Sequence, residues 1–484
     1  MDDFEEVARR LRRVNVNAPN HGDAHGVLVC NGGESVIELT GNFTIDAGTW
    51  PGWFDLRLRQ SDGQMIYIHS AVRTSMTFGR GDEPRSATLF PNFVVDRAEG
   101  LDADGRCRKI SFGLDGWLAC FAYNYFETLD FSGPVAESLG ETLETARHAF
   151  AREEPFFPHE VYVANHFGTL VDFEVEGRRY SIFAGIRHSG SRDRLNNQVQ
   201  LIGSIEFPEA TDLDAATDAC WDWRRYFNQM AMAVLPFTGM SVAASREPEA
   251  RLGNLYLPNG TRSLSAGELR APHASDMPLN RWDDRVAASE AMRSWLSRVE
   301  ERRFFRAALD RVLARPGHIA IEDAVTLCAG IETLSELSTR ESLPTAVLDA
   351  MVTAALGAAA DGGLQLDASR VRGVLGGLQN DDLRRRLRRL ASIAAPDTQQ
   401  DVVERWIAVI LPLRTLGAHG RRPATDHDFI AGPAVAALAA LCARYDLQSA
   451  GVPDRCASGA ASLPRQNWQQ ALMGLRSLQE AGTR

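Results

Sequence analysis

The sequence predicts an α+β multidomain protein, with a β-rich N-terminal part of the antiparallel sandwich or barrel-like kind followed by an all-α bundle. Short stretches of alternating apolar and polar residues, separated by Gly and Asp turns, are typical of strands and dominate residues 26–207. Toward the C-terminus, apolar residues recur at helical spacing instead. A turn-rich stretch without periodicity lies between them, which gives domains at residues 1–258 and 282–484 and a linker at 259–281.

Residues 1–20 are expected to form a short charged helix or an arm. The clearest strand is FDLRLRQ at residues 54–60, where Leu56 and Leu58 share one face. Glu176-Gly177 between two apolar stretches predicts a hairpin turn. Further strands are expected at residues 65–69, 109–112, 117–123, 161–163, 170–175, 180–186, 199–207 and 252–257, and helical insertions at 136–152 and 212–234.

The second part is predicted to be a series of helices joined by short loops. Gly376-Gly377 predicts a break inside one of them. The expected helices cover residues 284–314, 319–338, 344–359, 367–392, 400–419, 427–445 and 466–480.

The composition indicates a cytoplasmic protein without a metal or other cofactor. The charged N-terminus is unlike a signal peptide, and the apolar runs are shorter than the roughly 20 residues of a membrane span. Seven scattered cysteines without a CxxC pair argue against a disulfide framework or a zinc site. His21 and His25 lack further ligands nearby, and the phosphate-cradling GxxxxGK[ST] motif is absent.

Charge is distributed unevenly along the chain. The formal net charge is −11, yet residues 370–484 hold 16 basic and 10 acidic residues, a net of +6, which leaves −17 for the remainder. Such asymmetry favours a polyanionic partner for the C-terminal segment. Lys109 is the single lysine, so the abundance of arginine is attributed to genome composition rather than to RNA affinity.

The positive segment contains an unusually apolar stretch, residues 401–422. Its apolar surface is too broad for a surface helix, which predicts a helix inside a bundle. This helix carries Arg414 and His419 and then reaches a glycine stop signal. Arg421 and Arg422 follow directly and are candidates for RNA contact.

The Arg-x4-His spacing alone is weak. About one such pair is expected by chance in a chain of this composition, and a second pair, Arg422 and His427, spans a proline in a predicted loop. Five residues along an ideal helix separate two side chains by about 140°. Pro412 and Gly417 would loosen the helix and let Arg414 and His419 converge on one cleft.

The segment RTLGAH, from Arg414 to His419, resembles the signature of HEPN domains, which are helical bundles defined by Arg, a polar residue, three more residues and His. Thr415 stands where the family usually has Asn, Asp or His. Glu332 resembles the acidic residue that many HEPN domains carry near the site. The β-rich first part, with GVLVCNGGESVIELTG at its start, is similar to the ApeA family of bacterial anti-phage abortive-infection proteins.

This resemblance implies a metal-independent endoribonuclease with tRNA as its expected substrate, which acts as a homodimer with facing motifs and is triggered by phage infection. The residue types suit that chemistry, because RNA supplies its own nucleophile, the 2′-OH. His419 is predicted to transfer protons as general acid or base, and Arg414 to bind the scissile phosphate. Glu332 and Thr415 are predicted to support them.

Other features have plainer interpretations. The arginine run at residues 384–389 could follow a phosphate backbone or form a solvated helix face. The aromatic residues of 221–227 are predicted to pack in a core. The alternative function is a non-catalytic binding or scaffold protein whose helical domain only dimerises. A carbohydrate-binding or hydrolase sandwich is less favoured, since no paired carboxylates stand out.

Overall fold

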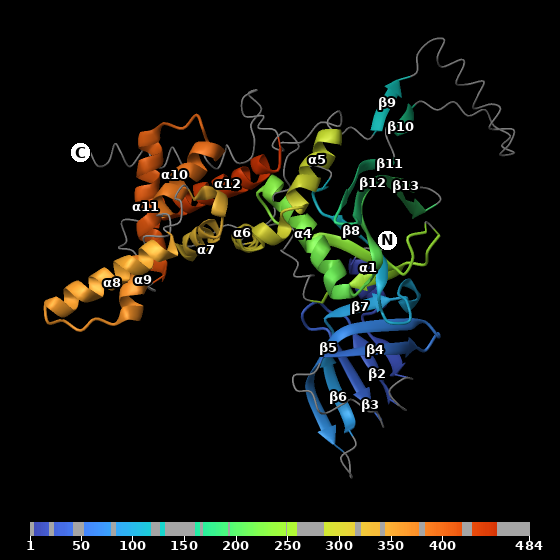
Figure 1. Cartoon of the computed structure of the whole chain (residues 1–484). Helices are drawn as coiled ribbons and strands as arrows, with labels where there is room; N and C mark the ends of the chain where they lie inside the picture. The colour runs from blue at the N-terminus through green and yellow to red at the C-terminus, as the bar shows by residue number, and fades with distance from the viewer. Residues whose placement is uncertain are drawn as a thin grey trace, which may run out of the picture.

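The computed structural model describes residues 4–18, 24–41, 53–78, 84–117, 126–130, 160–164, 168–191, 194–247, 249–258, 285–314, 321–338, 344–376, 383–418 and 428–452. An antiparallel β region built from the N-terminal part of the chain is followed by a helical region (Figure 1). The coarse α+β prediction is therefore confirmed.

The strands of the described residues form one large antiparallel sheet and a separate pair, β9 with β10. Their bounds are β1 Val14–Ala18, β2 Ala24–Val29, β3 Val36–Thr40, β4 Trp53–Gln60, β5 Met65–Phe78, β6 Pro84–Phe90, β7 Phe93–Asp96, β8 Cys107–Leu114, β9 Phe126–Asp130, β10 Glu160–Ala164, β11 Gly168–Val175, β12 Arg178–Ser191, β13 Arg194–Thr211, β14 Phe237–Ala243 and β15 Gly253–Tyr256.

Six strands close into a ring in the order β5, β4, β1, β2, β3, β6 and back to β5. The 14 residues of β5 allow its first half to pair with β7 and its second half with β6. Ser70 lies between these halves with φ 54°, and its N–H donates to Asp55 Oδ1 on β4 at 2.9 Å. This left-handed residue marks the point where β5 leaves one partner strand for the next.

The rest of the sheet is open and runs in the order β7, β15, β14, β8, β13, β12, β11. The predicted hairpin joins β11 to β12, because Val175 pairs with Arg178 and both turn residues, Glu176 and Gly177, have positive φ. The alternation predicted for β4 is also confirmed, since Leu56 and Leu58 are buried while the arginines between and after them are not.

Several strands were not predicted. The expectation of a helix or arm over residues 1–20 is only partly right, because helix α1 (Phe4–Arg10) gives way to β1 at Val14. The alternation of Val14, Val16 and Ala18 carries that strand. β14 was missed because its residues are almost all buried and show no alternation. The helix expected at 136–152 and the strand expected at 117–123 fall wholly or almost wholly outside the described residues.

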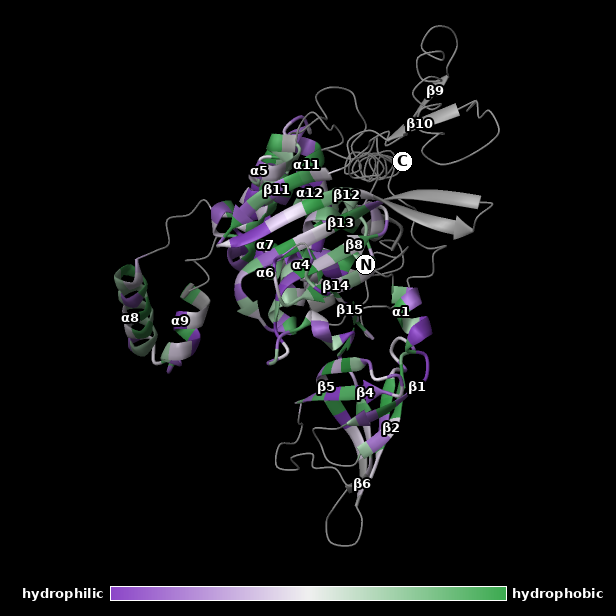
Figure 2. Cartoon of the chain, turned by 90° about the vertical axis from the view of Figure 1, so that its right-hand side faces the viewer, coloured by the Kyte–Doolittle hydropathy of each residue, from purple (hydrophilic) through white to green (hydrophobic). Residues whose placement is uncertain are grey.

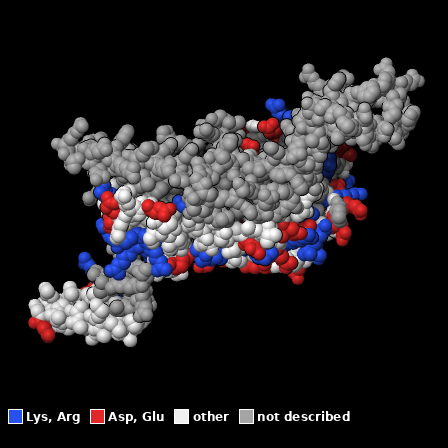
Figure 3. All heavy atoms as spheres, turned by 90° about the horizontal axis from the view of Figure 1, so that it is seen from above, with Lys and Arg blue, Asp and Glu red and all other residues white. Residues whose placement is uncertain are grey.

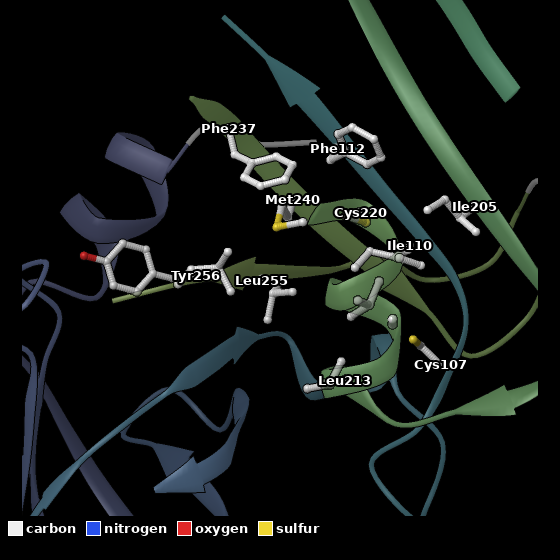
Figure 4. Close-up of a cluster of buried hydrophobic side chains, with 14 of the residues drawn as sticks. Cys107, Ile110, Phe112, Ile205, Leu213, Cys220, Phe237, Met240, Leu255 and Tyr256 are labelled. Atoms are coloured by element: carbon white, nitrogen blue, oxygen red, sulfur yellow. The ribbon is translucent and has the colours of Figure 1, made fainter. Parts of the chain in front are cut away.

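Helix α4 (Leu213–Ala231) lies across the open sheet and closes the first hydrophobic core (Figure 4). Its Asp212 cap accepts a hydrogen bond from the N–H of Ala215 at 2.7 Å. Trp223 and Phe227 are fully buried, and both rings pack edge-on against Trp117, which follows β8. The prediction that these aromatic residues belong to a core is confirmed.

The helices of the second part follow the predicted order. Ser297 and Arg298 divide the helix expected at 284–314 into two. The helix expected at 319–338 ends at Glu332 and is followed by a 3-10 turn. The bounds are α5 Arg285–Leu296, α6 Val299–Leu313, α7 Ile321–Glu332, α8 Thr345–Asp361, α9 Ala368–Gly376, α10 Leu383–Ala394, α11 Gln400–Ala418 and α12 Asp428–Ser449. The 3-10 turns are η2 Ala98–Gly100 and η5 Ser335–Leu337, and the helix expected at 466–480 is outside the described residues.

A second hydrophobic core lies among α6, α7, α10, α11 and α12. The hairpin of α8 and α9 projects from this body (Figures 1 and 2). The first core also includes residues of α5, such as Trp295, and the end of α12, such as Leu447. Helix α12 therefore contributes to both cores and joins the two regions.

Candidate active site

Helix α11 lies inside the second core, as its apolar surface predicts. Its buried face consists of Val402, Val403, Trp406, Ile407, Ile410 and Leu413. The indole Nε1 of Trp406 donates to the carbonyl of Ala434 on α12 at 3.1 Å, so the ring is held by a hydrogen bond as well as by packing. This contact fixes the rotation of α11 and with it the direction of its remaining faces.

Arg414 stands on the edge of α11 that faces α7. Its Nη2 lies 3.2 Å from Oε1 of Glu332, the last residue of α7. Each of the two side chains is 40% exposed, so the ion pair is open to solvent and can exchange partners. The structure therefore brings together two of the residues that the sequence singles out, from positions 82 residues apart.

Arg386 of α10 holds the end of α7 that carries Glu332. Its buried guanidinium donates through Nη1 to the backbone carbonyls of Glu332 at 3.0 Å and Leu334 at 2.8 Å. A cation at this point satisfies carbonyls that have no helical partner and complements the negative end of the helix dipole. Arg386 is thus a positioning residue for Glu332.

Sequence reasoning missed this role because Arg386 was considered only as part of an arginine run. The signal was present in the spacing, since Leu383, Arg386, Leu387 and Leu390 share the apolar face of α10. An arginine on such a face is placed to meet buried acceptors.

Cys328 lies one turn before Glu332 and is buried. Burial and, to a smaller extent, the charge of Glu332 raise the pKa of its thiol, and the charge of Arg414 lowers it; the resulting pKa is about 12. The thiol is therefore protonated near neutral pH and is not a nucleophile. All five cysteines among the described residues are free and buried.

Thr415 does not turn toward Arg414 in this structure. Its hydroxyl donates to the carbonyl of Leu411 at 3.0 Å, one turn back in the same helix. The side chain is exposed, and rotation about χ1 would release the hydroxyl. Helix α11 continues through Pro412 to Ala418.

The remaining predicted site residues, His419, Arg421 and Arg422, lie outside the described residues, as does His427 of the second Arg–His pair. The site that the structure describes is thus the Arg414–Glu332 pair, its support by Arg386 and the buried thiol beneath it. Arg414 can bind an anionic ligand through its planar guanidinium group, and Glu332 can give up this guanidinium when the ligand binds.

Two further features bear on ligands. Among the described residues there is no group of three or more His, Cys, Asp or Glu side chains that could hold a metal ion. In the same part of the chain, no helix combines the length and the apolar character needed to cross a bilayer.

Comparison of the chain with protein-family models, with curated proteins and with solved structures gives no match.

Proposed function

We propose that the chain is a metal-independent HEPN endoribonuclease, with tRNA as its expected substrate, that acts in abortive-infection defence against phage. The observation that carries this proposal is the solvent-open Arg414–Glu332 pair, which lies near the end of a helix that is buried along its preceding turns. His419 follows Arg414 by five residues in the sequence. The HEPN assignment, the trigger and the sensing or regulatory role of the β-rich region belong to this proposal.

The reaction begins at the RNA itself. The 2′-OH attacks the adjacent phosphorus, the bond to the 5′-oxygen breaks, and the products are a 2′,3′-cyclic phosphate and a 5′-OH. His419 accepts the proton of the 2′-OH or supplies one to the leaving oxygen. Arg414 leaves Glu332 and pairs with the phosphate as its charge develops.

In this proposal Glu332 orients Arg414 before the substrate arrives. Without it, a long exposed guanidinium would sample many rotamers. Two chains, each with its own pair, form the proposed homodimer, and Arg421 and Arg422 add contacts to the RNA backbone.

Digestion of tRNA by the purified full chain, with and without EDTA, tests the proposal. Cleavage that persists in EDTA and falls at least about 100-fold in His419→Ala and in Arg414→Ala is the expected result. Arg405→Ala is a matched control, because Arg405 lies on the same helix, is 41% exposed and pairs with Asp401 at 2.6 Å. Equal cleavage by His419→Ala and the wild type would refute the assignment.

One observation favours the second candidate, a non-catalytic scaffold protein whose helical domain only dimerises. The α8–α9 hairpin projects from the body and exposes Val347, Leu364 and Leu366 (Figure 2). Solvent-facing apolar side chains on one projection are typical of contact surfaces. A chain that leaves RNA intact, and whose dimer dissociates in sedimentation after all three are changed to Ser, would establish this candidate.

A further inference from the structure

A stripe of arginines on α10 borders a pocket at the far end of α11 from Arg414. Arg388 and Arg389 follow Arg385 by three and four residues, so the three side chains project toward one side of the helix. Ser392 continues the same side one turn later. All four line a pocket of about 570 Å³. That volume is in the range of small-molecule sites in proteins.

The opposite wall of the pocket comes from the turn between the helices and the start of α11. It supplies a hydroxyl from Thr398 and an amide from Gln400. Pro396 and Val403 add an apolar surface beside these polar groups. Convergent cations, two neutral hydrogen-bonding side chains and an apolar wall form the combination that a phosphorylated ligand with a flat organic part requires.

The arginines beside the pocket differ in their carboxylate partners. Glu404 accepts from Arg388 Nε at 2.5 Å and from Arg384 Nη1 at 3.4 Å, so one carboxylate serves two arginines. Within the described part of the chain, Arg389 has no carboxylate partner. Lys and Arg side chains gather beside the projecting α8–α9 hairpin, at the same end of the molecule (Figure 3).

The arginine run is therefore not a uniform solvated face. Arg386 faces inward and caps α7, whereas Arg385, Arg388 and Arg389 face the pocket. This division separates a structural arginine from a group that is placed to bind an anion.

We propose that the pocket between α10 and α11 binds a nucleoside phosphate, with Arg385, Arg388 and Arg389 on the phosphate and Pro396 and Val403 against the ribose or base. The nucleoside phosphate belongs either to a free nucleotide or to an RNA strand. Guanidinium groups bind phosphate oxygens in a bidentate fork, which an arginine cluster can supply from several sides.

This site goes beyond the proposed ribonuclease activity and does not require it. Gln400 and Arg414 are 14 residues apart on α11, which corresponds to about 21 Å of helix. The pocket is therefore separate from the scissile phosphate. An RNA strand bound at both places would be held several nucleotides away from the point of cleavage.

The test uses the full chain with His419→Ala, so that RNA stays intact, and compares two double variants. R385Q/R389Q removes two charges from the pocket. R179Q/R303Q is the control, since Arg179 and Arg303 are exposed arginines with carboxylate partners elsewhere on the surface. Thermal melting of both variants checks folding. The probes are AMP and ATP in calorimetry, and a fluorescein-labelled single-stranded RNA in anisotropy at several salt concentrations.

We expect R385Q/R389Q to lose at least about tenfold in affinity for one or both probes, and the control to bind as the parent does. Loss toward AMP or ATP identifies a free nucleotide as the ligand. Loss toward RNA alone, with a salt dependence reduced by about one unit of slope per lost phosphate contact, identifies an RNA strand.

Equal binding by the two double variants, or binding of neither probe by the parent chain, would overturn the proposal. The outcome is independent of the ribonuclease test. If R385Q/R389Q loses binding and the wild type does not cleave RNA, the pocket proposal stands and the ribonuclease proposal fails. If the wild type cleaves RNA and R385Q/R389Q binds as the control does, the ribonuclease proposal stands and the pocket proposal fails.

Discussion

At the scale of single residues, Arg386 and Arg389 show how neighbouring arginines take different roles. One turn of α10 separates a buried guanidinium that satisfies backbone carbonyls from one that lines a pocket. The difference comes from the direction of each side chain relative to the core and not from residue type.

Replacing Arg386 with Ala is expected to lower the free energy of unfolding by about 2–3 kcal/mol, because carbonyls at the end of α7 lose their donor and stay buried. Urea unfolding measures the change. Arg389→Ala is the control and is expected to stay within about 0.5 kcal/mol of the wild type. Equal midpoints for the two variants would contradict the capping role.

His69 on β5 is held by carboxylates from two other elements. Its Nδ1 lies 2.9 Å from Asp55 Oδ1 on β4, and its Nε2 lies 2.9 Å from Asp214 Oδ2 in the first turn of α4. Burial disfavours the charged ring, but its contacts with the two carboxylates outweigh this effect and raise the pKa of His69 to about 9. Tyr67 donates to Asp55 Oδ2 at 2.8 Å and completes the cluster.

This cluster predicts a loss of stability in mild alkali. The pKa of His69 is higher in the folded chain than its ordinary value of 6.5, so its stabilisation is complete below about pH 6.5 and is lost as the pH rises through about 9. Because Asp55 and Asp214 are about half exposed, we expect about 1–2 kcal/mol.

Denaturant unfolding at several values between pH 6 and pH 10 measures this loss as the difference between the wild type and His69→Asn. A constant difference across that range would show that the ring is not charged in the folded state. Asp55 provides a second window, because burial raises its pKa but hydrogen bonds from His69, Ser70 and Tyr67 lower it further, to about 2. Its contribution is lost only in strong acid.

At the scale of elements, α11 is buried along most of its length, and the predicted site residue Arg414 becomes partly exposed only near its end. Trp406 is central to this arrangement because it combines a large buried ring with a hydrogen bond to α12. Trp406→Phe keeps most of the apolar surface but leaves the Ala434 carbonyl without this donor, and is expected to cost about 1 kcal/mol. Trp406→Ala leaves a cavity as well and is expected to cost about 3–5 kcal/mol.

Guanidinium chloride unfolding of the two variants separates the contributions of hydrogen bond and ring. Similar losses for Phe and Ala would mean that the hydrogen bond, and not ring packing, holds α11 in place. Arg405→Ala on the same helix is the control. It removes only an exposed ion pair and is expected to change the free energy of unfolding by less than about 1 kcal/mol.

At the scale of the whole molecule, a buried ionic cluster lies where α5, α6 and α12 meet. Asp446 is fully buried and accepts from Trp295 Nε1 at 2.9 Å, Arg302 Nη1 at 2.5 Å and Arg306 Nε at 2.8 Å. Burial opposes the charge of Asp446, but Arg306 and Arg302 hold its pKa below the ordinary value. Trp295 belongs to the first core and α12 to both, so this cluster connects the two regions.

Asp446→Asn is expected to destabilise the chain by about 3–5 kcal/mol, because Arg306 loses its buried counter-charge and Arg302 keeps only Glu336. Scanning calorimetry measures the loss of stability and the number of unfolding transitions. We expect one transition in the wild type and two in the variant, because the two regions then unfold separately. Substitution of all three charged residues by Met is expected to be less harmful than D446N alone. A D446N variant with the same unfolding transition as the wild type would show that this cluster does not connect the two regions.

Prediction from the sequence succeeded where structure is local. The helices of the second part follow from apolar periodicity over single stretches of chain, and the β11–β12 turn follows from Glu176-Gly177. Fully buried strands such as β14 were missed, because their residues show neither alternation nor helical spacing.

The α+β class and the burial of α11 follow from the sequence, because periodicity is a property of neighbouring positions. Arg414 and Glu332 remain predicted site residues, which the structure brings within 3.2 Å of each other. The closing of six strands into a ring, the support of Glu332 by Arg386 and the connection of two cores at Asp446 are seen only in the packed chain. Each of these depends on groups far apart in the chain, whose meeting is set by how helices and strands pack and not by any local pattern.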